Sequence, residues 1–468
     1  MSTDYAHPAA SRGLFAGYLA LLLWIPVPLG SNRPWAWAIL ELVVFALTLW
    51  WLVGYARGNN HRSPALIGAW PALLCMALWL VYVALQLVPL PPELLQFLSP
   101  AAARWHADAA WPLQHVAAPL TLDQYATRDG LLKSATYVAF FALSLALLDR
   151  RERIAATAYA LVISGFAQAM YGGLTALASQ PGADSVAHGT FVNRNHFAGY
   201  LVMCLSIGLG LLIGSLTGEK SRSWKQFFRN IIAWILSTKM LLRLALVIMV
   251  IALVLSRSRM GNSAFFISML VTGAIGLLLA KRAPRSMVIL LSTLVVIDIF
   301  IVGAYFGVEK VVERLEKTQL EDERPESTLA LAIWKDYPAF GSGLGSFRVV
   351  FPRYRDPHLV ETYTHAHNDY VEFASETGAV GIALLGLMVL MSFAVALRAQ
   401  YVRRDPLMRG ISFGAMMGII ALMIHSSVDF NLQIPSNALT FMLVLALAWI
   451  SLYYGQFERG GDGFSRDN

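Results

Sequence analysis

The sequence predicts an all-α integral membrane protein with about twelve transmembrane helices and one large loop outside the membrane, between the ninth helix and the tenth. The first observation is composition: of 468 residues, 57% are hydrophobic and only 14% are charged, and the mean hydropathy is +0.56. Soluble globular proteins carry about 25% charged residues. The second observation is that apolar stretches close to the roughly 20 residues needed to cross a bilayer recur along the whole chain.

These stretches locate the expected spans. The first is interpreted as a retained span rather than a signal peptide, because no small-residue cleavage site follows it. The two cysteines, Cys75 and Cys204, lie inside apolar runs and do not indicate a disulfide framework. The spans are expected at Leu14–Leu29, Trp35–Val53, Ala65–Val88, Gly130–Leu148, Ile154–Leu177, His196–Leu216, Leu241–Leu255, Gly261–Ala280, Met287–Phe306, Ala379–Leu397, Ile411–Ile424 and Asn437–Tyr453.

The distribution of Lys and Arg among the short loops predicts the orientation, since these residues accumulate in cytoplasmic loops. With the N-terminus inside, the inner loops are strongly basic, whereas the short outer loops hold only Arg33, Arg194, Arg257 and Arg259. The same bias explains the net charge of +7 without a nucleic-acid partner. The inner loops contain Arg57 and Arg62; Arg150, Arg151 and Arg153; Lys220 to Lys239; Lys281, Arg282 and Arg285; and Arg403, Arg404 and Arg409.

One polar stretch, T-H-A-H-N-D-Y-V-E-F-A-S-E-T-G-A-V-G over Thr364–Gly381, runs directly into an apolar span. Asn368 and Asp369 are residue types that begin helices by accepting from free amides of the first turn. A helix that begins there holds His365 and His367 at the outer membrane boundary. A histidine near working pH is suited to removing a proton from an attacking hydroxyl.

Arginines on the same outer face go against the charge bias, and an anionic substrate would explain them. A guanidinium matches phosphate oxygens with a planar fork and keeps its charge at any relevant pH. Arg194, Arg257, Arg259 and Arg324 would together bind a diphosphate and stabilise it as a leaving group without a metal. No Cys/His cluster has the spacing of metal ligands, so no metal is expected.

Each of these residues also has an ordinary structural interpretation. Arg257 and Arg259 would serve as snorkelling anchors, and Arg194 as a helix cap or a headgroup contact. Arg324 lies among acidic residues of a solvated helix, and Asp429 is interpreted as an N-cap or as a structural partner of His425. Glu372 and Glu376 are expected on a solvent-facing helix surface. The run Gly341-Ser-Gly-Leu-Gly345 is expected to be a turn rather than a phosphate loop.

At these motifs the chain resembles the O-antigen ligases and the related O-antigen polymerases of bacterial surface polysaccharide assembly. The family signature is His, then Asn, Ser or Gln, nine residues, Gly, two residues and Gly. Here it reads His367-Asn368, then Asp369–Thr377, Gly378, Ala379-Val380 and Gly381. The segments W-K-D-Y-P-A-F-G-S-G-L-G-S-F, N-R-N-H-F-A-G-Y, S-R-S-R and H-S-S-V-D-F also resemble the family, over roughly 189–447.

The resemblance implies a GT-C-like membrane glycosyltransferase that needs no cofactor and inverts the transferred sugar. It would move a glycan from undecaprenyl diphosphate to an acceptor hydroxyl on lipid A–core or a related glycan. By similarity, His367 would be the base, with His365 beside it, while Arg194 and Arg257 would bind the diphosphate; Arg259 and Arg324 are the further candidates. The enzyme would span the bacterial inner membrane with its active site facing the periplasm.

Three parts of the chain follow from this interpretation: residues 1–306 with nine spans, a periplasmic loop over 307–378 with the His-Asn motif, and residues 379–468 with three spans. An O-antigen or exopolysaccharide polymerase shares the same motifs and stays an alternative. Protein O-glycosylation would need a protein-binding groove. A transporter of lipid-linked glycans would instead need charges near the bilayer midplane, where Glu41 and Asp298 are the main exceptions.

Overall fold

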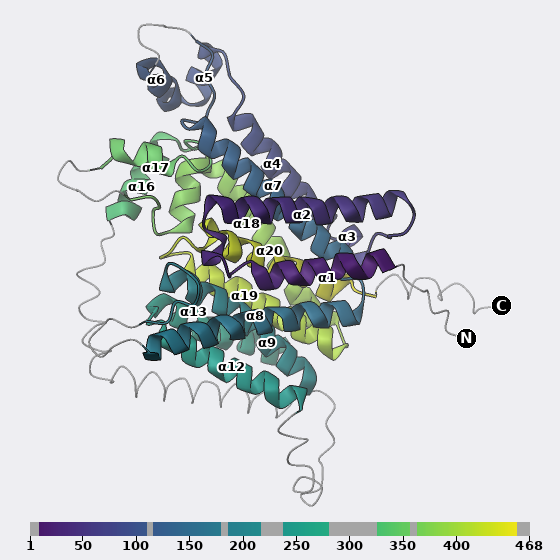
Figure 1. Ribbon diagram of the computed structural model, residues 1–468. Coiled ribbons are helices and arrows are strands. Elements are labelled where there is room, and N and C mark those ends of the chain that lie inside the picture. The colour runs from purple at the N-terminus through teal and green to yellow at the C-terminus, as the bar shows by residue number, and fades with distance from the viewer. Residues whose placement is uncertain are drawn as a thin grey trace, which may run out of the picture.

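The computed structural model describes residues 9–109, 116–178, 186–216, 237–279, 325–355 and 363–455. Within these ranges every regular element is a helix, apart from an isolated bridge between Leu90 and Ala118. The predicted span Met287–Phe306 lies outside the described residues, as do residues 307–324 (with Arg324) and 356–362 of the large outer loop. The all-α prediction is confirmed (Figure 1).

Nine of the described helices are long and apolar enough to cross a membrane. Two of the predicted spans are shorter helices, α1 (Ala9–Trp24) and α4 (Trp70–Gln86). The predicted span Ala65–Val88 is wrong as one helix, because α3 (Pro64–Gly68) ends before α4 begins with Pro71 in its first turn. The nine are α2 (Pro34–Ala56), α7 (Gln124–Leu147), α8 (Arg151–Ala178), α9 (Arg194–Leu216), α12 (Thr238–Leu255), α13 (Arg259–Leu279), α18 (Asp369–Val402), α19 (Pro406–His425) and α20 (Pro435–Tyr453).

Side-chain caps determine where several of these helices begin. Asp123 accepts from the amides of Tyr125 and Ala126 at the start of α7. Ser237 caps α12, Asp405 caps α19, and Asn368 caps α18. Each cap satisfies amides that have no partner within the first helical turn. The predicted start of α18 at Asn368 is therefore confirmed.

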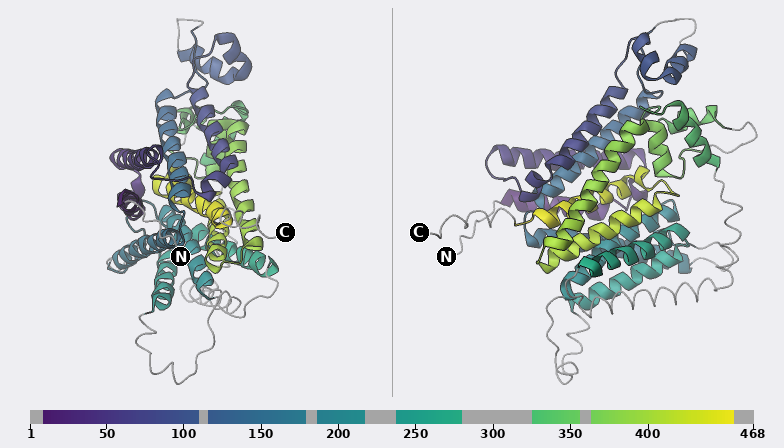
Figure 2. Two further views of the ribbon diagram at one scale, coloured as in Figure 1. Left: turned by 90° about the vertical axis from the view of Figure 1, so that its right-hand side faces the viewer. Right: turned by 180° about the vertical axis from the view of Figure 1, so that it is seen from behind.

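Helices α9, α19 and α20 form the centre of the bundle. In the most apolar 18-residue stretch of each helix, 94% of α20 and 89% of α9 is buried inside the protein. Glycines bring α9 and α19 together: a Cβ on Gly410 would lie 2.2 Å from the carbonyl oxygen of Gly210. Small residues allow this close approach between membrane helices. Figures 1 and 2 show α4 and α7 on one side of this centre and α8 and α12 on the other.

The bundle has two chemically different ends. At one end, Arg151 pairs with Asp405, and Arg403 donates to the carbonyl of Tyr454, so two of the basic loops meet there beside the end of α20. We name this the basic end. The opposite end, which we name the site end, holds the first turns of α9, α13 and α18 and the last turn of α19 (Figure 1).

Short helices extend the site end beyond the bundle. They are α5 (Pro92–Leu98), α6 (Pro100–Ala109), α16 (Pro325–Asp336) and α17 (Phe347–Val350). Arg353, which follows α17, connects α17 to α6. Its guanidinium pairs with Asp108 of α6 at 2.9 Å and lies 4.5 Å from the centroid of the Trp105 ring. Figure 2 shows α5 and α6 projecting furthest from the bundle.

Candidate active site

The His-Asn motif lies where the chain enters α18. His367 has a left-handed backbone, with φ +49°, which is uncommon for a residue with a Cβ. His365 contacts Glu372 at 2.8 Å between Nδ1 and Oε1, and the amide of Ala366 donates to the other carboxylate oxygen at 2.7 Å. Glu372 thus holds the histidine segment from within the helix.

The predicted solvent-facing surface of Glu372 and Glu376 is wrong. Both side chains are buried, because the helix packs this face against other parts of the site end. Glu376 accepts from the amide of Phe347 at 3.1 Å. Asp369 is also buried, and it accepts from the Ser426 hydroxyl at 2.7 Å and from the Leu432 amide at 3.1 Å. These carboxylates bind backbone and hydroxyl donors rather than water.

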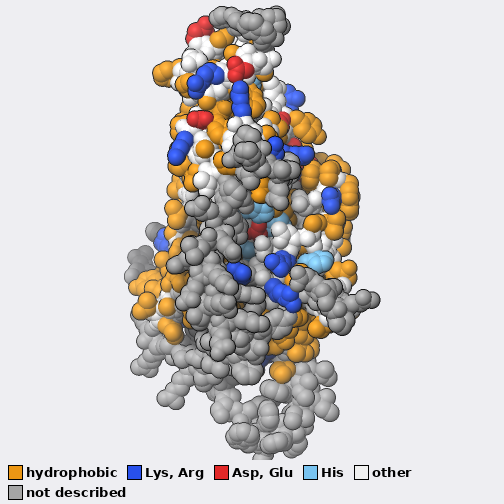
Figure 3. All heavy atoms as spheres, turned by 90° about the vertical axis from the view of Figure 1, so that its left-hand side faces the viewer, with side chains coloured by type: hydrophobic (Ala, Val, Ile, Leu, Met, Phe, Trp, Pro, Cys, Tyr) orange, Lys and Arg blue, Asp and Glu red, His pale blue; other side chains and the backbone are white. Residues whose placement is uncertain are grey.

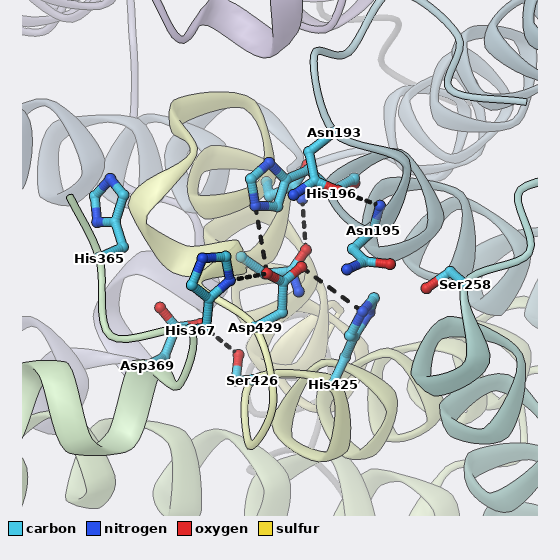
Figure 4. A network of polar contacts seen from close by, with 12 residues as sticks. Asn193, Asn195, His196, Ser258, His365, His367, Asp369, His425, Ser426 and Asp429 are labelled. Atoms are coloured by element: carbon cyan, nitrogen blue, oxygen red, sulfur yellow. Dashed lines mark hydrogen bonds and ion pairs between the residues drawn. The ribbon is translucent and has the colours of Figure 1, made fainter. Parts of the chain in front are cut away.

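Asp429 is the centre of a group of three histidines (Figure 4). It is fully buried, and its Oδ1 lies 3.6 Å from His196 Nε2 and 3.8 Å from His367 Nδ1. Its Oδ2 lies 3.9 Å from His425 Nε2. The interpretation of Asp429 as a partner of His425 is therefore correct but incomplete, because two more histidines share the same carboxylate.

The charge of Asp429 is maintained by these neighbours. Burial acts to raise the pKa of its carboxyl, but the contacts with His196, His367 and His425 outweigh burial and hold the pKa below its ordinary value. The buried carboxylate therefore stays negatively charged with its Oδ1 3.8 Å from His367 Nδ1, and a negative charge there would stabilise positive charge that forms on a neighbouring group.

Phe430 packs the histidines in place. Its ring is stacked on His365 with centroids 4.3 Å apart, and it meets the edges of His196 and His367 at 4.5 Å and 4.8 Å. Consecutive residues of the V-D-F-N segment thus contact all four histidines of the site. Rigid neighbours of this kind hold a catalytic ring in one orientation.

Arg194 begins α9, two residues before His196. Its side chain is exposed. Hydrogen bonds fix the backbone on both sides of it. Asn193 accepts from the amide of Asn195 at 2.8 Å, and Asn437 donates to the carbonyl of His196 at 2.9 Å. The structure therefore brings the N-R-N-H motif to the histidine group (Figure 4).

The S-R-S-R segment connects α12 to α13 beside the start of α9. A Cβ on Gly261 would lie 2.6 Å from that of Ala198, which places the first turns of α13 and α9 in close contact. Arg257 is half-buried with φ +51°, and Arg259 is exposed. Ser258, between them, lies on the far side of Asn195 from His365 in Figure 4. Arg324 lies outside the described residues, so its predicted role stays a prediction.

Figure 3 looks directly at the site end. Histidine side chains gather near the middle of this face, with Lys and Arg side chains beside them. Histidine and carboxylate clusters also occur at metal sites. Among the described residues, no group of three or more His, Cys, Asp or Glu side chains is arranged to hold a metal ion.

Residues 341–345 form a turn, as predicted. Gly341, Gly343 and Gly345 all have positive φ, at +71°, +111° and +81°. The amides of Ser342 and Gly343 donate to the carbonyls of Ser375 and Glu376 at 2.9 Å and 2.8 Å. Because these amides are occupied, the turn docks onto α18 and does not offer a phosphate cradle.

Comparison with known families decides the class of protein. Residues 244–386 match the model of the O-antigen ligase family. This part of the chain is similar to the O-antigen ligase family. A search of curated proteins finds no match for the chain. The match confirms the resemblance seen in the sequence, and with the apolar helices it supports a multi-pass membrane glycosyltransferase of O-antigen ligase type.

The O-antigen ligase match covers the S-R-S-R segment, both histidines of the His-Asn motif and the carboxylates of α18, but not the parts of the site on α9 or after residue 386. His196 and Arg194 come from α9, before the match, and His425, Asp429 and Phe430 come after it. These residues complete the site by tertiary contact. Sequence reasoning placed none of His196, His425 or Phe430 in the site, although the N-R-N-H and H-S-S-V-D-F motifs contain all three.

The structure explains why the two signature positions, 378 and 381, are glycines. Gly378 interrupts α18 with φ +60° and ψ −167°, and a Cβ there would lie 2.3 Å from the carbonyl oxygen of Ala339. The amides of Ala379 and Val380 instead donate to the carbonyls of Pro338 and Ala339. At Gly381 a Cβ would lie 2.1 Å from Thr377 Oγ1. The signature spacing thus joins the His-Asn motif to the docked loop before α18.

A cavity of about 650 Å³ opens on the His365 side of the site. Polar side chains gather at one end of its lining, and Trp, Phe, Met and Leu side chains form most of its wall. The lining comes from α2, α4, α7, α18 and α20 and includes Trp37, Met76, Trp79, Asp129, Lys133, Thr364, His365, Asp369, Glu372, Glu376, Gly386, Met388, Phe441 and Met442.

Proposed function

We propose that this protein transfers a glycan from undecaprenyl diphosphate to an acceptor hydroxyl, on the periplasmic face of the bacterial inner membrane. The observation that carries the proposal is the position of His367. Its side chain is 34% exposed on one side and faces the buried Asp429 carboxylate on the other. A general base needs both access to substrate and a group that stabilises its protonated form.

In the proposed reaction, the ring nitrogen of His367 that does not face Asp429 accepts the proton of the acceptor hydroxyl. The oxygen then attacks the anomeric carbon from the side opposite to the diphosphate. The bond between that carbon and the diphosphate oxygen breaks, and the diphosphate leaves with the electron pair. The sugar is inverted, and undecaprenyl diphosphate is released.

Arg194 and Arg257 are proposed to bind the diphosphate, with Arg259 and Arg324 as further candidates. Asn195 of the N-R-N-H motif and Ser258 of the S-R-S-R motif lie on the opposite side of His367 from His365 (Figure 4). Charge that builds on the leaving group is stabilised by guanidinium groups that are already in place. In this mechanism the arginines do the work that a metal ion does in many other glycosyltransferases, and no metal is required.

The acceptor in the leading proposal is lipid A–core or a related glycan, as for an O-antigen ligase. A polymerase that joins lipid-linked repeats would use the same residues and is the second candidate. Protein O-glycosylation and transport of lipid-linked glycans are weaker. The histidines and the motif arginines lie at the site end rather than along the spans, which favours an enzyme over a transporter.

The test uses purified protein in lipid nanodiscs, with a glycan on undecaprenyl diphosphate and excess EDTA. One reaction receives lipid A–core and a second receives only further lipid-linked glycan. Mass analysis should find the glycan on lipid A–core and free undecaprenyl diphosphate. Longer chains on the carrier in the second reaction would identify a polymerase. No product in either reaction, or product only after addition of magnesium or manganese, would contradict the proposal.

A further inference from the structure

The cavity beside His365 has no role in the mechanism above, which uses only His367, Asp429 and the arginine motifs. Its volume of about 650 Å³ is that of a ligand site. It follows α18 from Asp369 to Leu390, which at 1.5 Å per residue is roughly 30 Å. A space of this length with aromatic and aliphatic walls is suited to a lipid chain.

The polar end of the cavity differs in charge from the arginine motifs. Four carboxylates line it, Asp129, Asp369, Glu372 and Glu376, and Lys133 is the one Lys or Arg in the lining that the structure describes. Lys133 is already committed, because it pairs with Asp129 at 2.7 Å and lies 3.8 Å above the ring of Trp37. Among the described lining residues no Lys or Arg is therefore left unpaired for a diphosphate, whereas carboxyl groups can hydrogen-bond with the hydroxyls of an uncharged group such as a sugar.

Two of these carboxylates have unused hydrogen-bonding capacity. Asp369 Oδ1 and Glu376 Oε2 are buried and make no hydrogen bond with the described residues. Buried polar atoms normally have a partner. Sugar hydroxyls are donors that match carboxylate acceptors, and they would enter the cavity next to His365.

We infer that the cavity is the acceptor site and takes a lipid-anchored glycan, with its sugar at the carboxylates and its chains along α18. This inference rests on the proposed function, because it places the donor on the opposite side of His367. Figure 4 shows His367 between His365, which lines the cavity, and Ser258 of the S-R-S-R segment. A base in that position meets the hydroxyl of one substrate and the sugar of the other.

Two glycines provide a matched pair of variants. Gly386 lines the cavity in the interior of α18, and Gly173 lies in the interior of α8 and does not line it. A Cβ at either position meets no atom within 4 Å. The first atom of a new side chain therefore has free space at both positions. Gly386→Phe places an aromatic ring at the cavity wall, and Gly173→Phe places the same ring on α8, away from the cavity.

The experiment measures equilibrium binding in nanodiscs, without turnover, for undecaprenyl diphosphate, lipid A–core and a lipid-linked glycan repeat. Gly386→Phe should weaken binding of whichever glycan lipid the wild type binds by about tenfold or more, equivalent to 1.4 kcal/mol. Binding of undecaprenyl diphosphate should not change, and Gly173→Phe should match the wild type for every probe. Thermal unfolding of both variants checks that they fold.

Three results would overturn the inference. The first is wild-type binding of the glycan lipid by Gly386→Phe. The second is selective loss of undecaprenyl diphosphate binding, which would assign the cavity to the donor. The third is a wild-type protein that binds neither glycan lipid, which would exclude a lipid-anchored acceptor. Because binding is measured without donor turnover, failure of the transfer reaction itself is a separate result and counts against the proposed function.

Discussion

At the scale of single residues, the proposed active site contains positions with an unusual backbone conformation or an unusual charge. Of the non-glycine residues that the structure describes, four have a positive φ, and two of them are His367 and Arg257. Strained backbone of this kind persists where surrounding contacts impose it and is enriched at functional sites. The proposed base and one proposed diphosphate ligand are thus two of the four, and the other two, Leu29 and Ser31, lie in the turn between α1 and α2.

Arg257 allows strain and function to be separated. Arg257→Ala and Arg257→Gly both remove the guanidinium, so each should weaken binding of undecaprenyl diphosphate by about 1.5–3 kcal/mol. Only glycine relieves the left-handed backbone, so Arg257→Gly should be more stable than Arg257→Ala by about 1–2 kcal/mol. Arg257→Lys should restore little binding, because the planar fork is lost. Binding and thermal unfolding measure the two effects, and unchanged binding in both variants would remove Arg257 from the donor site.

Asp429→Asn should lower the rate by roughly a hundredfold, because the charge that stabilises protonated His367 is lost. A depressed pKa means that the ionised carboxylate contributes its stability in full above about pH 3.9, the ordinary value, and loses it only as the pH falls toward the lower folded pKa. Asp429 therefore stays ionised between pH 5 and pH 8, and its own protonation should not change the rate in that range.

The same variant predicts the direction of a pH shift. Without the negative charge, protonation of the neighbouring histidines becomes harder, so the acid limb of the rate should move to lower pH by about one unit. A pH–rate profile of Asp429→Asn against the wild type measures this shift. An acid limb that stays in place or moves to higher pH would show that Asp429 does not act on the base.

At the scale of elements, the sequence predicted most of the helices because each span carries its own apolar signal. The start of α18 was also predictable, since Asn368 is a local cap. The burial of Glu372 and Glu376 was not, because it depends on the turn 341–345 that docks on the helix from another part of the chain. The break of α18 at Gly378 is also set by that docking and not by local sequence.

Gly378→Ala tests the docking of this loop. The substitution puts a Cβ into the carbonyl of Ala339 at a glycine-only backbone conformation, so it should destabilise the protein by about 3 kcal/mol. Gly173→Ala is the control, because its Cβ is unhindered in a helix interior and should stabilise by about 0.5–1 kcal/mol. Thermal unfolding in detergent compares them. Equal melting temperatures would show that the close contact at Gly378 is absent.

At the scale of the whole molecule, two of the basic loops meet at the basic end, while the histidine and arginine motifs that the structure describes lie at the site end. The contacts of Asp429 with His196 and His367 were not predictable, because three segments distant in sequence meet only in the folded bundle. Sequence reasoning could find the motifs one by one, since each lies at the outer end of a span. It could not show that the carboxylate of Asp429 contacts three histidines.

The orientation itself is a prediction for the folded protein in its membrane. The native cysteines are first removed by Cys75→Ala and Cys204→Ala. One new cysteine is then introduced, either by Asn59→Cys at the basic end or by Gln96→Cys on α5. Both positions are exposed. An impermeant maleimide added to intact spheroplasts should label Gln96→Cys at once and Asn59→Cys only after permeabilisation. The opposite pattern would place the site in the cytoplasm.

The most direct measurement concerns His367 as the base. His367→Ala should lower the rate of glycan transfer by roughly a hundred- to ten-thousand-fold, with undecaprenyl diphosphate binding and thermal stability close to the wild type. His365→Ala is the matched control and should keep measurable activity, because His365 contacts Glu372 rather than Asp429. The wild-type rate should fall as the pH drops and the imidazole becomes protonated, and the residual rate of His367→Ala should lack that fall. A His367→Ala enzyme that turns over within a few-fold of the wild type, or that keeps the same pH dependence, would contradict the account.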